Sequence, residues 1–189
     1  MRIKTKNRLE GWLAPLAKRT PIPPNLLTIF SVISMLAAGI QVFGNNFLPA
    51  ALLVLLSGFL DMLDGSVAKA KGSSSRFGAL LDRVADRASD IIILSSFILA
   101  GTVNPWLGMI VLGVTLLASY TAACLEAATK TRVGEALSWR AVRLVVIAAG
   151  LAVATVESAS VFQPLFLVIG VISAYALAER LWQSHRVLR

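Results

Sequence analysis

The sequence predicts an all-α integral membrane protein, in which six transmembrane helices follow a short interfacial amphipathic helix. Three observations predict this fold: an apolar composition, uncharged runs long enough to span a bilayer, and basic residues confined to alternate connections. Of the 189 residues, 57% are hydrophobic and 15% are charged, against about 45–50% and about 25% in soluble domains. The net charge of +8 in so apolar a chain favours contact with a membrane surface over nucleic acid. A single cysteine excludes an internal disulfide.

The N-terminal segment 1–22 is predicted to be a cytoplasmic juxtamembrane helix. Apolar side chains recur there at helical spacing among Lys and Arg residues: Leu9, Trp12, Leu13 and Leu16. Such a pattern is typical of a helix that lies on the membrane surface. Pro21, Pro23 and Pro24 end this helix, and Asn25 or Pro24 begins the next one.

Six segments are predicted to cross the membrane as one catalytic domain over 23–184, followed by a cytoplasmic tail, 185–189. Three uncharged segments have about the 20 residues that a bilayer requires: 26–43, 106–125 and 158–177. Three shorter uncharged runs must include charged neighbours to reach across: 47–60, 91–103 and 144–156. These neighbours place several aspartates and arginines at the edge of the membrane or inside it.

The distribution of basic residues predicts the orientation. All 18 Lys and Arg residues fall in the N-terminal segment, around the second and fourth connections, or in the C-terminal part. The first, third and fifth connections contain none. Because basic residues favour the cytoplasmic side, we expect a multi-pass protein of the cell membrane with both termini in the cytoplasm.

Two pairs of aspartates are predicted to meet near the cytoplasmic surface. Asp61 and Asp64 are three residues apart at the end of the second span. Asp82 and Asp86 are four residues apart at the beginning of the third span. Each spacing places the pair on one face of a helix. Because the cytoplasmic stretch 69–77 joins the two spans, both pairs lie at one depth.

These aspartates predict a cation site. Ionised carboxylates at this depth must be paired or hold cations, and oxygen ligands favour magnesium, manganese or calcium over zinc. The alternative is a set of structural ion pairs with Arg83, Arg87 and Lys69. Arg83 and Arg87 each follow an aspartate by one residue and so point about 100° away from it, which favours the cation site.

The complete pattern is more specific than either pair. It reads Asp61-x-x-Asp64-Gly65-x-x-Ala68-Lys69, then eight residues, then Gly78-x-x-x-Asp82-x-x-x-Asp86. This resembles the signature of the CDP-alcohol phosphotransferase family, which has Arg at the position of Lys69. Lys keeps the charge but loses the two-pronged guanidinium, so we expect activity to survive the difference.

The resemblance implies an activity. Members of the family transfer a phosphatidyl-type group from a CDP-linked lipid to the hydroxyl of a small alcohol and release CMP, in phospholipid biosynthesis. The resemblance also implies two divalent cations, magnesium or manganese, an active site open to the cytoplasm, and a homodimer. Whether the lipid tails are ester-linked or ether-linked is left open by the apolar spans.

The resemblance also implies roles for individual residues. The metal ligands would be Asp61, Asp64, Asp82 and Asp86, and Asp86 would also be the catalytic base. The residues that bind the CDP-lipid would be Asp61, Asp64, Gly65, Ala68, Lys69, Ser75, Asn25 and Thr28.

The acceptor is indicated less directly. The motif and Ser119-Tyr120 look most like the phosphatidylinositol-phosphate and archaetidylinositol-phosphate synthase branch, which uses inositol 1-phosphate. Acceptor-binding residues would then be Arg140, Arg143 and Arg180, unless these anchor the helix ends to lipid phosphates. That branch usually carries Lys and Arg where this chain has Ala122 and Cys124. Glycerol 3-phosphate, serine and free inositol therefore remain alternatives.

A divalent-cation transporter is the competing function. Transporters place their sites near the bilayer midplane, on interrupted helices. Here the carboxylates border a cytoplasmic loop, and Glu157 is the one charged residue in the outer halves of the predicted spans. Because nothing polar continues outward from the aspartates, the sequence favours the transferase.

Overall fold

The computed structural model describes residues 15–129 and 139–187. Within these ranges the chain folds into six long α-helices and one short 3-10 turn, without a strand. The helices are α2 (Pro24–Phe43), α3 (Phe47–Ala70), α4 (Arg76–Leu99), α5 (Pro105–Thr129), α6 (Trp139–Glu157) and α7 (Phe162–Val187). The turn η1 (Ala159–Val161) leads into α7.

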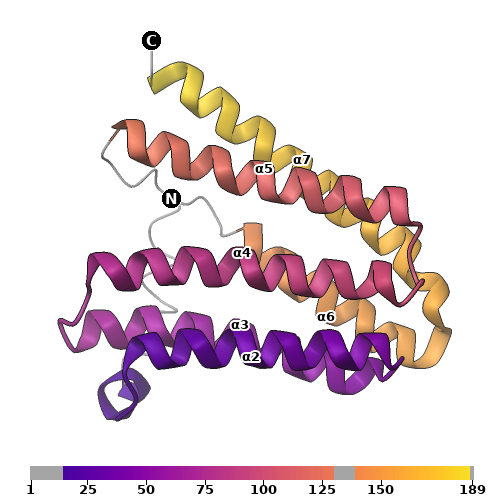
Figure 1. Cartoon of the computed structure of the whole chain (residues 1–189), viewed down its shortest axis with the longest axis horizontal. Helices are drawn as coiled ribbons and strands as arrows, with labels where there is room; N and C mark the ends of the chain where they lie inside the picture. Colours follow the sequence, from indigo (N-terminus) through magenta and orange to yellow (C-terminus); the bar gives the residue numbers. More distant parts are fainter. Residues whose placement is uncertain (1–14, 130–138, 188–189) are drawn as a thin grey trace.

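The helices run back and forth along one common direction (Figure 1). The α2–α3, α4–α5 and α6–α7 connections lie at one end of the molecule. The α3–α4 connection, the beginnings of α2 and α6 and the ends of α5 and α7 lie toward the other end. Short connections between long helices favour such antiparallel neighbours. The second end also holds the motif aspartates, because α3 ends and α4 begins there.

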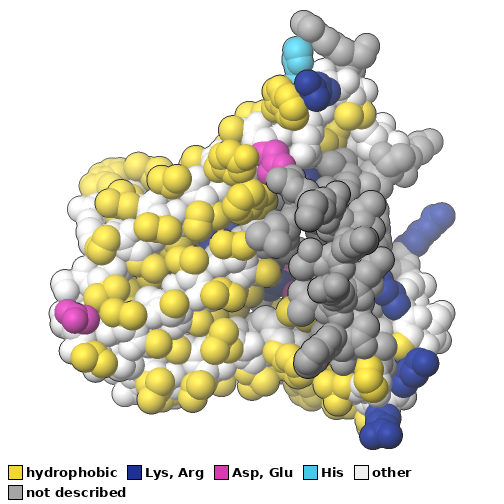
Figure 2. Space-filling model, turned by 180° about the vertical axis from the view of Figure 1, so that it is seen from behind, with side chains coloured by type: hydrophobic (Ala, Val, Ile, Leu, Met, Phe, Trp, Pro, Cys, Tyr) yellow, Lys and Arg dark blue, Asp and Glu magenta, His cyan; other side chains and the backbone are white. Residues whose placement is uncertain are grey.

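The predicted all-α membrane fold is confirmed at this level. Among the described residues, five helical segments are long and apolar enough to cross a membrane: α2, α3, α5, α6 and η1 with α7. The uncharged stretch of α4 begins only at Ile91, so whether α4 completes a sixth span stays a prediction. Figure 2 shows apolar side chains over most of one face, with Lys and Arg side chains toward one end.

Helices α3 and α4 extend beyond their uncharged runs, which are too short to cross a bilayer alone. α3 continues past its apolar part to Ala70, and α4 begins at Arg76, well before its apolar part. The third uncharged run was predicted to continue to residue 103, but α4 already ends at Leu99. Gly101 has a φ of +68° there. This left-handed conformation, which glycine adopts without a Cβ penalty, turns the chain toward α5.

The predicted interfacial helix lies mostly outside the described residues, including Leu9, Trp12 and Leu13. Residues 15–19 are helical. Ala17 is fully buried in a cluster with Leu27 of α2 and Leu63 of α3. The start of the described chain therefore packs on α2 and α3 close to the motif aspartates, and its position relative to the membrane stays a prediction.

Aromatic rings join α4 to α7 at the end of the bundle opposite the aspartates. The ring of Phe97 lies 4.8 Å from that of Phe162 and 5.4 Å from that of Phe166, measured between centroids. All three side chains are fully buried. Close packing of this kind, rather than exclusion of water, holds helices together inside a bilayer.

We predict that Phe97→Ala destabilises the fold by about 3–5 kcal/mol, because it leaves a cavity between α4 and α7. Leu99→Ala is the matched control on the same helix, since Leu99 is 74% exposed and Phe97 is 0% exposed. Thermal unfolding of both variants in one detergent measures the difference. Equal losses in the two variants would contradict this packing role.

Candidate metal and active site

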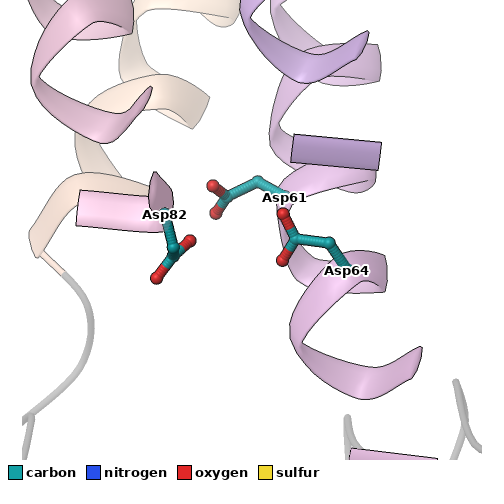
Figure 3. Close-up of side chains that lie close together, drawn as sticks. All are labelled: Asp61, Asp64 and Asp82. Atoms are coloured by element: carbon teal, nitrogen blue, oxygen red, sulfur yellow. The ribbon is translucent and has the colours of Figure 1, made fainter. Parts of the chain in front are cut away.

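Three motif carboxylates converge between α3 and α4. One oxygen from each of Asp61, Asp64 and Asp82 lies within 4.8 Å of the others. Figure 3 shows Asp61 and Asp64 side by side on α3, with Asp82 facing them from α4. The spacing of three residues brings the first two to one face of α3, as predicted. These three aspartates are called the carboxylate trio below.

The carboxylate trio fits a hard divalent cation. Asp64 is 5% exposed, and its Oδ2 accepts a hydrogen bond of 2.5 Å from the Thr28 hydroxyl on α2. Asp61 Oδ1 is buried and accepts no hydrogen bond from the described residues. A buried carboxylate oxygen without a donor is costly, and a cation removes that cost. Oxygen-only ligands suit magnesium or manganese.

Asp86 faces two arginines rather than the trio. Its Oδ1 lies 2.8 Å from Nη1 of Arg140, and its Oδ2 lies 3.3 Å from Nη2 of Arg87. The same Arg140 nitrogen lies 2.6 Å from Asp61 Oδ2. A guanidinium from α6 thus bridges a carboxylate of α3 and a carboxylate of α4.

The ion pairs differ from those that the sequence suggested as an alternative. Arg87 does contact Asp86, but Arg83 pairs with Glu126 on α5. The bridging role falls to Arg140, which was predicted to bind the acceptor. Helical spacing could not identify this partner, because it depends on which helices pack together.

A second ion pair lies one turn deeper in the bundle. Arg143 Nη2 lies 2.6 Å from Asp90 Oδ2, and the two side chains are 6% and 1% exposed. Asp90 follows Asp86 by four residues and Arg143 follows Arg140 by three, so each partner sits about one turn beyond its neighbour. Two arginines of α6 therefore pair with two aspartates of α4.

A family model described as CDP-alcohol phosphatidyltransferase matches residues 22–178, which include all the motif aspartates. The chain belongs to the CDP-alcohol phosphatidyltransferase family. It is therefore a membrane transferase of phospholipid biosynthesis that moves a phosphatidyl-type group from a CDP-lipid to an alcohol. The family depends on divalent cations, in agreement with the carboxylate trio.

Relatives with assigned names cover most of this transferase. It is 33% identical over 147 residues to the archaetidylinositol phosphate synthase of Pyrococcus horikoshii, covering 78% of each chain. It is 31% identical over 143 residues to the archaetidylinositol phosphate synthase of Methanothermobacter thermautotrophicus, covering 75% of this chain and 72% of that one.

Solved structures share the fold of this transferase. Phosphatidylinositol phosphate synthase of Mycobacterium tuberculosis, with CDP-DAG bound, superposes with a TM-score of 0.76 at 23% identity, covering 91% of this chain and 92% of that one. The same enzyme in complex with manganese and citrate gives a TM-score of 0.75 at 24% identity, covering 91% and 88%.

Three of the residues predicted to bind the CDP-lipid, Asn25, Gly65 and Ser75, lie on α2, on α3 and at the start of α4. Ser75 precedes α4, and its Oγ accepts a hydrogen bond of 2.9 Å from the Gly78 nitrogen. A Cβ on Gly78 would lie 3.1 Å from that oxygen and 3.2 Å from Asn25 Oδ1, so glycine lets α2 and α4 approach there. Beside Gly65 nothing lies within 4 Å of a Cβ position, which leaves room for a ligand.

The remaining predicted residues lie near the end of α3 and on α7. Ala68 and the exposed Lys69 lie in the last turns of α3, beyond Asp64. Arg180 lies on α7 and is half-buried. No contact between Arg180 and the aspartates is recorded among the described residues. Its role in acceptor binding stays a prediction, as does that of Arg143.

We predict that the Asp90–Arg143 pair behaves as a unit. Asp90→Asn or Arg143→Gln alone leaves one buried group without its partner, so each should lower stability by about 3–5 kcal/mol. Replacing both by apolar residues of similar size, Asp90→Leu with Arg143→Met, should recover most of that loss. Denaturant unfolding in detergent measures the free energy of unfolding of the wild type, the two single variants and the double variant.

The exposed pair of Arg83 and Glu126 is the control for this comparison. Arg83 is 48% exposed at its side chain, so Arg83→Gln should cost less than about 1 kcal/mol. A double Asp90/Arg143 variant no more stable than the worse single variant would contradict the pairing.

Proposed function

We propose that this transferase uses inositol 1-phosphate as its acceptor and CDP-lipid as its donor, and forms a phosphatidyl-type inositol phosphate and CMP. The convergence of Asp61, Asp64 and Asp82 carries the proposal, because their hard oxygen ligands can hold the cations that would neutralise a pyrophosphate. The two named archaeal relatives, both archaetidylinositol phosphate synthases, support the choice of acceptor. An anionic acceptor also suits a site that Arg140 faces.

The motif residues are proposed to divide the work. Asp61, Asp64, Asp82 and Asp86 hold two magnesium or manganese ions, which offset the charge of the pyrophosphate when bound. Thr28 fixes the orientation of Asp64 through its hydrogen bond. Asn25, Gly65, Ala68, Lys69 and Ser75 line the donor site, where Lys69 contacts a phosphate and Gly65 admits the nucleotide.

The reaction is a single displacement in this proposal. The acceptor hydroxyl oxygen bonds to the phosphorus that carries the lipid, and the bond from that phosphorus to the bridging oxygen of CMP breaks. Asp86 takes the proton of the hydroxyl as general base. Among the proposed acceptor residues, Arg140 is nearest to Asp86. Arg180 would complete the phosphate site, and Arg143 would reach the acceptor only after leaving Asp90.

We predict that the purified protein releases CMP from a CDP-lipid with inositol 1-phosphate and magnesium or manganese. A chelator should abolish the release, and Asp86→Asn should lower kcat by about 10²–10⁴ with a smaller change in KM, since it removes a proton acceptor. Glu157→Gln is the control, because Glu157 lies at the opposite end of α6 from Arg140. CMP release only with glycerol 3-phosphate, serine or free inositol would show that the acceptor is not inositol 1-phosphate. The absence of any metal-dependent CMP release would overturn the proposal.

We further propose that α4 is a sixth span, that segment 1–22 lies on the inner leaflet, and that both termini and the active site are cytoplasmic. The absence of Lys and Arg from alternate connections supports this orientation. The family resemblance supports a homodimer. On this proposal the two ends of α4 lie on opposite sides of the membrane.

Single-cysteine labelling tests the orientation. In a Cys124→Ser background, which removes the one cysteine of the chain, Pro105→Cys should react with an impermeant maleimide in intact cells. Ser74→Cys, at the other end of α4, should react only after the membrane is permeabilised. Both positions are exposed. Equal accessibility of the two positions would contradict the sixth span.

A further inference from the structure

Asp86 differs from Asp61, which also contacts Arg140, in having an arginine beside each of its oxygens. Both of its oxygens face arginines, Arg140 at 2.8 Å and Arg87 at 3.3 Å. The carboxylate trio of Asp61, Asp64 and Asp82 instead brings three oxygens within 4.8 Å of one another. Asp61 of the trio also contacts Arg140, through Oδ2, but its Oδ1 accepts no hydrogen bond from the described residues, whereas each oxygen of Asp86 lies beside an arginine.

The guanidinium of Arg140 is held mainly by these two carboxylates. Its Nη1 contacts Asp61 and Asp86. Its Nε and Nη2 are buried and have no hydrogen-bond partner among the described residues. Leaving Asp86 would thus cost Arg140 few other interactions, and its unused donors would gain partners wherever acceptors are available.

Arg140 and a cation on Asp86 exclude one another at close range. Magnesium binds an oxygen ligand at about 2.0–2.1 Å. A guanidinium in contact with the same oxygen, as Arg140 is with Asp86 Oδ1, would then face a double positive charge at short distance, where the surrounding protein screens little. Asp61 differs, because its Oδ1 is unpaired while Arg140 contacts Oδ2, so it can serve Arg140 and a cation together.

We propose that Arg140 is a positioning residue that acts as the internal counter-cation of Asp86 and makes the two metal sites unequal. The first cation binds the trio with Arg140 in place. The second cation binds Asp86 only when Arg140 leaves it, so its affinity is reduced by the free energy of that ion pair. This inference rests on the proposed function, which supplies the two cations.

Manganese binding to the purified chain, followed by electron paramagnetic resonance of the free ion, tests the inference without any substrate. The wild-type chain should bind one Mn²⁺ tightly and a second roughly 10-fold or more weakly. Arg140→Gln should tighten the second site by roughly 10-fold and change the first site less. Misfolding would weaken binding, so a gain of affinity cannot arise from it.

Two further variants complete the design. Arg83→Gln also removes one positive charge, from the end of α4 that carries the site. Because Arg83 pairs with Glu126, the Mn²⁺ affinities of both sites should match those of the wild type. Arg140→Lys keeps the charge without the two-pronged guanidinium, and its second site should fall between those of the wild type and Arg140→Gln. If Arg140→Gln does not fold, Arg140→Lys carries the test.

The outcomes separate this inference from the proposed function. Two equal sites in the wild type, or a second site that neither Arg140 variant tightens, would overturn the role of Arg140 and leave the transferase intact. Tightening by Arg83→Gln to the same degree would also overturn it, since net charge would then be the cause. A wild-type chain that binds no Mn²⁺ would contradict the proposed metal site itself.

Discussion

The need to neutralise carboxylates that are withdrawn from water governs this structure. Asp61, Asp64 and Asp82 are brought within 4.8 Å of one another by two helices, and like charges at that distance repel strongly where water is scarce. The partners that offset this repulsion come from other helices, with Thr28 on α2 and Arg140 on α6. The site therefore forms only when the bundle packs, and its charges in turn determine how those helices can pack.

Contacts without charge stabilise the rest of the bundle. Away from the aspartates, Phe97 and its aromatic neighbours fill the space between α4 and α7 without polar atoms. Between α2 and α3, the Ser57 hydroxyl donates a hydrogen bond of 2.8 Å to the Ser31 backbone carbonyl, which joins a side chain of α3 to the backbone of α2. Such contacts add stability where the hydrophobic effect cannot act. They allow α3 and α4 to carry repelling charges at their other end.

The sequence predicts the local part of this arrangement well and the long-range part poorly. On a helix, the spacing of three residues between Asp61 and Asp64 is enough to predict that both lie on one face. The end of α4 could not be predicted to the residue, because Gly101 can turn or continue a chain equally well. The partner of Asp86 depends on the packing of α6 beside α3, which no local pattern specifies. One signal was available: Arg140 and Arg143 repeat with nearly the same helical step as Asp86 and Asp90, so that two charge pairs of opposite sign can match turn by turn.

That matching has a consequence for a protein whose function requires bound cations. Without an internal cation, Asp86 and Asp61 would repel across the junction of α4 and α3, and the metal-free chain would have to separate these helices or protonate a carboxylate. The Arg140 guanidinium meets the same electrostatic need as a metal ion at nearly the same place. On the role proposed for Arg140, the helices keep one arrangement before and after metal binding, and only that side chain moves. Asp90 and Arg143, buried one turn deeper, form a second ion pair between α4 and α6 that does not involve Arg140. The Asp90–Arg143 pair thus joins α4 to α6 independently of the site. In the proposed role, the contact of Arg140 with Asp86 is the one that a metal ion replaces.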